Sequence, residues 1–166
     1  NSSTISDNRA SGIYAFGDIT VHSSTISSNR NSGIIIPSNI RPEGIVEVSS
    51  STISGNIGEA GGGIHAPGVV RVHSSTISGN SADTGGGIYS YTHSGGATNL
   101  TSSIVAGNTA AISSPDLSDN AAGTVTVTFS LIGDNSDSGL AEAQTPDVNG
   151  NLVGQPILAG GAGVID

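Results

Sequence analysis

The fold is decided by an eight-residue stretch, His73-Ser74-Ser75-Thr76-Ile77-Ser78-Gly79-Asn80. Related copies recur along the chain at residues 1–8, 22–29, 49–56, 101–108 and 128–135. The step between the final Asn residues of successive copies varies from 21 to 28 residues, although the motif keeps its length. A fixed motif with variable spacing predicts repeated strands that are joined by loops of different lengths.

Two further blocks complete each repeat. A Gly-Ile pair followed by a bulky residue starts at Gly12, Gly33, Gly63 and Gly87. A short alternating segment occupies residues 19–21, 46–48, 70–72, 98–100 and 125–127. Three such β-branched segments in each repeat, separated by Gly, Asn and Pro, indicate strands and turns.

One repeat cannot bury its apolar side alone, whereas stacked repeats can. The sequence therefore predicts an all-β fold, a right-handed parallel β-helix of about six coils with three strands in each coil. The repeats span residues 1–135. Residues 136–166 form a C-terminal tail without a clear repeat, which we expect to cover or cap the last coils.

Alternation along the first block assigns its inward residues. An apolar column points inward, formed by Ile5, Ile26, Ile53, Ile77, Val105 and Ile132. A second inward column, two residues earlier, is Ser in all six copies. The last residues of the copies are predicted to stack as an amide ladder at a corner of the helix: Asn8, Asn29, Asn56, Asn80, Asn108 and Asn135. This role is structural and not catalytic.

The outward residues of the first four copies all carry a hydroxyl group, with Thr4, Thr25, Thr52 and Thr76 at their centre. Three interpretations compete for this face. It is a solvated sheet surface, an ordered hydroxyl lattice that binds ice or a crystalline polymer, or a surface that packs on a second copy or on a glycan.

The hydroxyl array ends in the last two copies, where Ile104, Phe129 and Leu131 replace it. An exposed apolar cluster of this kind needs a cover. We expect the C-terminal tail, or the equivalent segment of a partner chain, to pack on this patch.

Composition excludes several classes of protein. The chain has 4 basic residues against 13 acidic ones, a formal net charge of −9 and no Cys. A nucleic-acid partner is not expected because such proteins carry a basic footprint. A disulfide scaffold is excluded, and no apolar run approaches the ~20 residues of a transmembrane helix.

Little in the sequence points to catalysis. No nucleophile motif, phosphate loop or redox pair is present, and no cofactor is expected. Glu47 and Arg71 share a register position in adjacent coils and are predicted to form an exposed lateral pair. Weak candidates for structural calcium are the acids of the C-terminal loops: Asp116, Asp119, Asp134, Asp137 and Asp147.

The motif Ser-Ser-Thr-Ile-Ser-Gly-Asn at residues 74–80, with Gly85-Gly86-Gly87-Ile88 after it, resembles the parallel β-helix repeats of bacterial secreted and surface proteins, including the polymorphic outer-membrane type. The stretches 103–110, 115–118, 130–135 and 149–154 resemble the end of the repeat region in choice-of-anchor Q domain proteins. The resemblance implies secretion or surface display and provides no catalytic residues.

Three functions follow as expectations. The first is a non-catalytic extracellular structural or adhesive module, located outside the cell or at its surface. The chain begins at the first residue of a repeat, so we expect either a longer parent solenoid or copies that stack end to end into a surface filament. The alternatives are a polysaccharide-binding or polysaccharide-processing enzyme and an ice-binding hydroxyl face.

Overall fold

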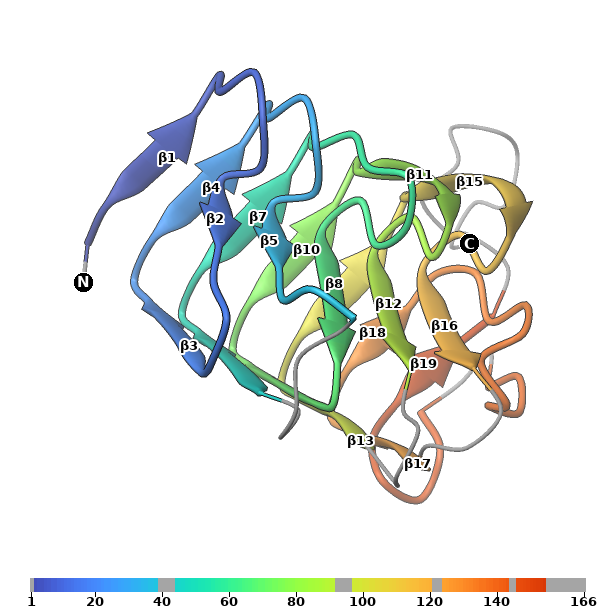
Figure 1. Ribbon diagram of the computed structural model, residues 1–166. Coiled ribbons are helices and arrows are strands. Elements are labelled where there is room, and N and C mark those ends of the chain that lie inside the picture. Colours follow the sequence, from blue (N-terminus) through green and yellow to red (C-terminus); the bar gives the residue numbers. More distant parts are fainter. Residues whose placement is uncertain (1, 39–43, 92–96, 121–123, 144–145, 155–166) are drawn as a thin grey trace.

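A computed structural model describes residues 2–38, 44–91, 97–120, 124–143 and 146–154. This part of the chain contains 19 strands and no helix. The strands form three long sheets and one short sheet in which every pairing is parallel. The chain passes from the first sheet to the second and the third and then returns to the first, so that the coils stack along one axis (Figure 1).

The first sheet contains seven strands: β1 (Thr4–Ser6), β4 (Thr25–Ser27), β7 (Thr52–Ser54), β10 (Thr76–Ser78), β14 (Ile104–Ala106), β18 (Leu131–Ile132) and β19 (Leu152–Val153). The second contains five: β2 (Ile13–Tyr14), β5 (Ile34–Ile35), β8 (Ile64–Pro67), β12 (Ile88–Tyr91) and β16 (Leu117–Asn120). The third also contains five: β3 (Ile19–His22), β6 (Ile45–Ser49), β9 (Val69–His73), β13 (Ala97–Thr101) and β17 (Thr124–Thr128). A two-stranded sheet joins β11 (Ser81–Thr84) to β15 (Thr109–Ser113).

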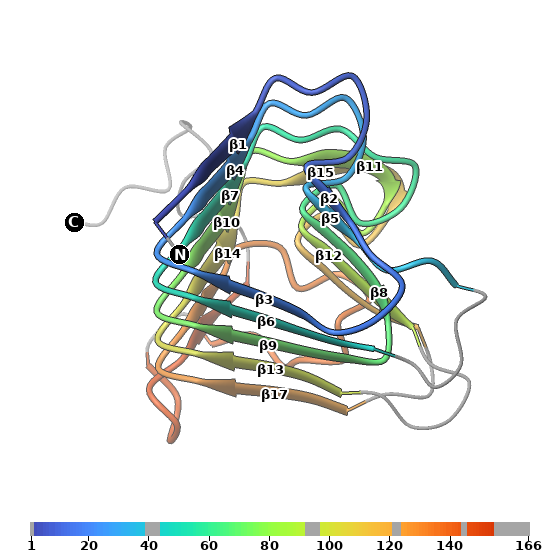
Figure 2. The same cartoon turned by 60° about the vertical axis from the view of Figure 1, so that its left-hand side comes forward.

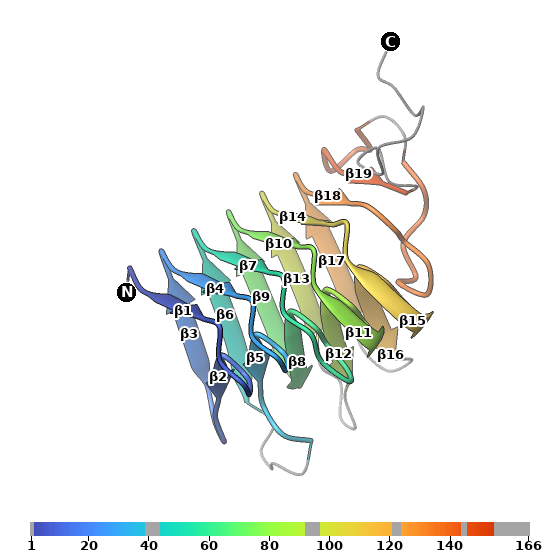
Figure 3. The same ribbon diagram turned by 90° about the horizontal axis from the view of Figure 1, so that it is seen from above.

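The expected all-β parallel β-helix is therefore confirmed, with a smaller number of coils. Five strands in each shorter sheet correspond to about four turns, compared with the six coils expected from the sequence. Figure 3 shows the strands of the first sheet side by side from β1 to β19, in chain order. The motif copy at residues 128–135 and the following β19 add strands to the first sheet alone.

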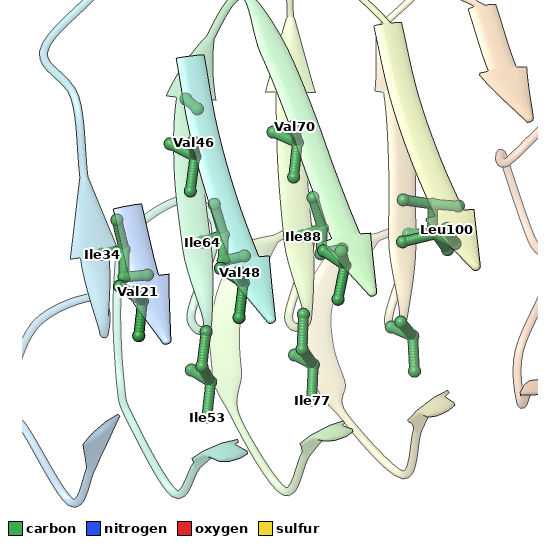
Figure 4. Close-up of a cluster of buried hydrophobic side chains, with 14 of the residues drawn as sticks. Val21, Ile34, Val46, Val48, Ile53, Ile64, Val70, Ile77, Ile88 and Leu100 are labelled. Carbon is green, nitrogen blue, oxygen red and sulfur yellow. The ribbon is translucent and has the colours of Figure 1, made fainter. Parts of the chain in front are cut away.

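The core is a set of apolar columns that run along the axis. Adjacent coils pair Ile26 with Ile53 and Ile53 with Ile77, and these three side chains are completely buried. The second sheet adds Ile34, Ile64 and Ile88 (Figure 4). The third adds a column of Val residues in which Leu100 lies between Val72 and Val127. Mainly Ile and Val recur at these positions. Adjacent strands lie about 4.8 Å apart, so each coil must pack a layer of side chains of the same size and shape as its neighbours.

The Gly of each Gly-Ile pair is required by close approach between coils. A Cβ atom on Gly63 would lie 2.5 Å from the carbonyl oxygen of Gly87 in the next coil, and one on Gly87 would lie 2.4 Å from that of Asp116. Neither gap is wide enough for a methyl group. The same Cβ atoms would also meet inward side chains and the amide of the Asn column.

Left-handed residues bound the first five strands of the first sheet, β1, β4, β7, β10 and β14, on both sides. In the fourth coil, Ser74 has a φ of 47° before β10 and Gly79 has a φ of 64° after it. Ser2, Ser23 and Ser50 share the conformation of Ser74. These Ser residues were expected to extend the flat hydroxyl array, but they form the corner between the third sheet and the first (Figure 2).

The repeat also continues beyond residue 135. Strand β19 pairs with β18 in the same register as the earlier strands, with Leu152 beside Leu131 and Val153 beside Ile132. The described part of the tail therefore adds a strand to the stack, because Asn151-Leu152-Val153 repeats the polar, outward and inward order of the earlier strands. Residues 155–166 lie outside the described part of the chain.

Candidate functional site

Five of the six expected Asn residues form a continuous chain of side-chain hydrogen bonds. Each Nδ2 donates to the Oδ1 of the next coil, at 2.8 Å from Asn8 to Asn29 and 2.9 Å from Asn80 to Asn108. Asn29, Asn56 and Asn80 are buried, and each also donates to the carbonyl of an inward Ile or receives a backbone N–H. The column therefore satisfies the hydrogen-bonding groups at a buried corner of the β-helix.

The prediction for the sixth member is wrong. Asp116, and not Asn135, follows Asn108, whose Nδ2 lies 2.7 Å from Asp116 Oδ1. The amide of Asn135 donates instead to the carbonyl of Leu140. Asp116 Oδ2 accepts the backbone N–H of Asp134 at 2.6 Å, so this one carboxylate connects two coils. A carboxylate accepts at both oxygens, whereas an amide would present N–H to N–H on one side.

The inward Ser column forms a second ladder. From Ser24 to Ser130, each Ser hydroxyl accepts the backbone N–H of the preceding coil, for example Ser24 N–H at 3.0 Å from Ser51 Oγ, and donates to the carbonyl two residues before itself. The ladder ends at Asn151, whose Oδ1 accepts the N–H of Ser130 and whose Nδ2 donates to the carbonyl of Val127. Sequence analysis missed this role because Asn replaces Ser.

The Thr column of the first sheet is in register. Thr4 pairs with Thr25, Thr25 with Thr52 and Thr52 with Thr76. Thr4 is exposed and the other three are half-buried by their neighbours along the column. The column is then continued by aliphatic residues, since Ile104 pairs with Thr76 and Leu131 with Ile104.

The apolar patch is partly framed by the tail. The Phe129 ring packs closely against Gly150: a Cβ atom on Gly150 would lie 2.5 Å from the ring. Pro146, Gly150 and Leu152 line a shallow hollow of about 330 Å³ together with Phe129 and the neighbouring patch residues. Phe129 remains 68% exposed and Ile104 42% exposed, so the described tail residues border the patch and leave it open.

The acidic candidates do not converge among the described residues. No group of three or more His, Cys, Asp or Glu side chains lies close enough to hold a metal ion in that part of the chain. Asp134 Oδ1 accepts from Ser136, and Asp147 Oδ1 accepts the N–H groups of Asn149 and Asn151. Asp137 has a left-handed backbone, and the side chain of Asp119 lies outside the described residues. Calcium binding stays a prediction.

Electrostatics distinguish two of these acids. Burial raises the pKa of Asp116, although the N–H groups of Asp134 and Asn108 act in the opposite direction. Hydrogen bonds from Asn151 and Asn149 lower the pKa of the exposed Asp147 carboxyl. The two carboxylates therefore stabilise local structure in different environments.

The outer face of the third sheet carries the expected charge pair. Arg71 Nη1 lies 3.2 Å from Glu47 Oε1, and both side chains are about half exposed, at 48% and 51%. His22 Nδ1 lies 2.8 Å from Ser49 Oγ on the same face. These contacts run between adjacent coils and form a polar surface.

Sequence analysis missed an aromatic strip on the outer face of the second sheet. We define this aromatic strip as Tyr14, Phe16, Ile35, His65, Tyr89 and Tyr91. The residue after each inward Ile points outward, and pairing places Tyr14 beside Ile35, Ile35 beside His65 and His65 beside Tyr89. The signal was the bulky residue that follows each Gly-Ile pair.

The rings of the aromatic strip contact one another at both ends. Tyr14 and Phe16 meet edge to face with centroids 5.3 Å apart. The His65 ring lies 5.6 Å from Tyr89 and 5.7 Å from Tyr91. Burial lowers the pKa of His65, whereas a hydrogen bond with the backbone of Ala60 raises it; burial is the larger influence.

A hollow of about 500 Å³ adjoins the strip at the corner between the first and second sheets. Its walls combine apolar and polar groups: Arg30, Asn31, Ser32, Ile35, Ile57, Gly58, Glu59, Ala60 and His65. Two members of the strip, Ile35 and His65, are therefore also part of the wall of the hollow.

The described residues define the class as a parallel β-solenoid protein with side-chain ladders. No family model, no curated protein and no solved structure matches this chain. Among the described residues there is no helix with the length and apolar character that a membrane crossing requires.

Proposed function

We propose that this chain is a non-catalytic structural and adhesive β-solenoid of the cell surface or extracellular space. The observation that carries the proposal is the unbroken stacking of coils from β1 to β19, with two side-chain ladders in its interior. Such a body is rigid along its axis and presents long, regular faces to a partner. The resemblance to choice-of-anchor Q and other bacterial surface repeats supports the same location.

Self-association is the structural half of the proposal. Within the described residues, β1, β2 and β3 each pair on one side only. Backbone groups alternate along a strand, and Ser3 and Asp7 bond to the second coil, so the N–H of Ser6 points away from it. A further coil, from a longer parent chain or from another copy, would pair at this edge. The apolar patch at the other end would accept the tail or a partner segment.

Electron microscopy and sedimentation of residues 1–166 over a wide concentration range test this assembly. We expect filaments or a growing mass for the chain and for Ser6→Ala, and no growth for Ser6→Pro, which removes the edge N–H. Unfolding curves are the control that tests whether Ser6→Pro is folded. A single-chain particle at every concentration, or assembly of Ser6→Pro equal to that of Ser6→Ala, would overturn the proposal.

Ice binding is a second candidate because the Thr column is in register over four strands. The variants Thr25→Tyr and Thr52→Tyr would disrupt the column, whereas Thr126→Tyr places the same side chain on the exposed face of the third sheet. Thermal hysteresis that is lost in the first two variants and kept in the third supports this candidate. Absence of hysteresis in the unmodified chain removes it.

Polysaccharide processing is the third candidate. Among the described residues, no cluster of acidic and basic side chains supports it. Release of sugar from a polysaccharide panel by the purified chain would establish this activity.

A further inference from the structure

We infer that the aromatic strip and the adjoining hollow bind an uncharged polysaccharide made of hexopyranose units. The inference rests on the proposed adhesive function and names its surface and its ligand class. It concerns the outer face of the second sheet, formed by β2, β5, β8, β12 and β16 (Figure 1).

The first argument is the distribution of aromatic residues. The chain has only 3 Tyr and 2 Phe. All three Tyr and one Phe lie in the aromatic strip, and Phe129 is the exception. Tyr14 is 57% exposed and Phe16 is 65% exposed, so packing of the core does not require aromatic side chains at these two positions. Aromatic side chains gathered on one outer face indicate a binding surface.

The second argument is the shape of the strip. Tyr14, Ile35, His65 and Tyr89 lie in one lateral column over four successive strands. The column therefore extends over three strand spacings, roughly 14 Å. A pyranose ring is about as long as one strand spacing, so a linear glycan would place one ring near each coil. Its apolar C–H faces would pack on the rings of Tyr14 and Tyr89.

The third argument is the hollow beside the column. Linear glycans present hydroxyl groups along their edges, and these need donors and acceptors close to the stacking surface. Arg30, Asn31, Ser32 and Glu59 provide both kinds of group in the wall of the hollow. The solvated first-sheet face offers hydroxyl groups but no ring, so it lacks half of this combination.

Charge selects the kind of glycan. The chain carries a formal net charge of −9 and has only four basic residues. Arg30 shares the hollow with the acidic Glu59, and burial lowers the pKa of His65, which disfavours its charged form. A polyanionic chain would be repelled by this protein at moderate ionic strength, whereas an uncharged chain would not.

The test uses the intact chain with insoluble cellulose and chitin, with the soluble hexaose of each, and with polygalacturonate as the anionic probe. We expect retention on at least one uncharged polymer and binding of its hexaose in calorimetry. Tyr14→Ala and Phe16→Ala should each weaken binding about tenfold. Phe129→Ala is the matched control, since Phe129 is 68% exposed but lies outside the strip. Unfolding curves show that each variant is folded.

Three outcomes would overturn the inference. These are no retention on any uncharged polymer, preference for polygalacturonate, and equal losses in Phe16→Ala and Phe129→Ala. A fourth outcome, binding that survives both strip variants but is lost in a first-sheet variant, Thr52→Tyr, would also overturn the inference but leave the proposed function intact. Filament formation is measured separately, so its failure and the failure of glycan binding are distinguishable.

Discussion

Asp116 takes the place that follows Asn108 in the amide ladder, with Asn108 Nδ2 2.7 Å from Asp116 Oδ1. The backbone N–H of Asn108 reaches the same oxygen at 2.9 Å, and that of Asp134 reaches the other oxygen at 2.6 Å. Three N–H groups therefore converge on one buried carboxylate. This arrangement ends the Asn column and attaches the next coil to it.

Replacement of Asp116 by Asn should destabilise the protein. The new Oδ1 still accepts from Asn108, but the new amide N–H faces the N–H of Asp134, so a buried donor loses its acceptor. We expect a loss of about 1–3 kcal/mol in the free energy of unfolding. Chemical denaturation measures it, and Asp137→Asn in an exposed turn is the control with little expected change. Equal stability of Asp116→Asn and the unmodified chain would contradict the role of the second oxygen.

The same carboxylate predicts a pH dependence. Burial raises the folded-state pKa of Asp116 above its ordinary value of 3.8, so the folded protein holds this proton more tightly than the unfolded chain. The contribution of Asp116 to stability is therefore greatest below that value and is lost as the pH rises through the raised pKa. The stability of the unmodified chain relative to Asp116→Asn should therefore fall as the pH rises from 3.8 through the raised folded-state pKa. A relative stability that rises over this range would contradict the assignment.

Interior ladder residues should be far more sensitive than surface Asn residues. Asn80 Oδ1 accepts the side-chain and backbone N–H of Asn56, and its Nδ2 donates to Asn108 and to the carbonyl of Ile53. Asn80→Ala leaves these buried groups without partners and should cost about 3 kcal/mol or more. Asn99→Ala, on the outer side of β13, should change stability by about 0.5 kcal/mol or less. Similar losses in both variants would show that the ladder contributes little.

Two Gly residues provide a matched test of coil spacing. Gly63→Ala places a methyl group 2.5 Å from a backbone oxygen of the next coil and should destabilise the protein by about 1–3 kcal/mol. At Gly17 nothing lies within 4 Å of the added Cβ, so Gly17→Ala should be neutral or stabilise by about 0.4–1 kcal/mol. Thermal or urea unfolding distinguishes them. The reverse order of stability would contradict the close approach of the coils at Gly63.

The Glu47–Arg71 pair should contribute little despite its 3.2 Å separation, because both side chains are about half exposed. A double-mutant cycle with Glu47→Gln and Arg71→Gln should give a coupling free energy of about 0.2–1 kcal/mol that shrinks in high salt. Glu59→Gln with Arg71→Gln is the control cycle for groups that do not pair. A salt-independent coupling above about 2 kcal/mol would contradict a solvated pair.

The parts of the structure that repeat were accessible from the sequence. Ile26, Ile53 and Ile77 recur at one position of the motif, and stacking in register then requires them to occupy one column. The same reasoning placed Asn29, Asn56 and Asn80 at a corner. These predictions needed only the two-residue alternation of a strand and the recurrence of the motif.

Positions where the repeat is broken could not be assigned in this way. Asn135 occupies the expected place in the motif, but Asp116, eight residues after Asn108, occupies the next position of the ladder, and Asn135 donates to Leu140. Asn151 replaces a Ser of the inward column, and Ser2 turns into a corner instead of extending the face. Asp116 and Asn151 take these places because their side chains reach backbone N–H groups, and Ser2 turns because of its left-handed backbone.

By itself, the sequence determined the fold class, the inward columns and the charge of this protein, because in-register stacking converts linear recurrence into columns. The tertiary structure alone decided how the ladders end and which side chains from distant coils become neighbours. Tyr14 and Tyr89 belong to one column only because β2, β5, β8 and β12 pair in succession. The aromatic strip and its hollow are therefore products of packing between coils, on which the proposed binding of glycan depends.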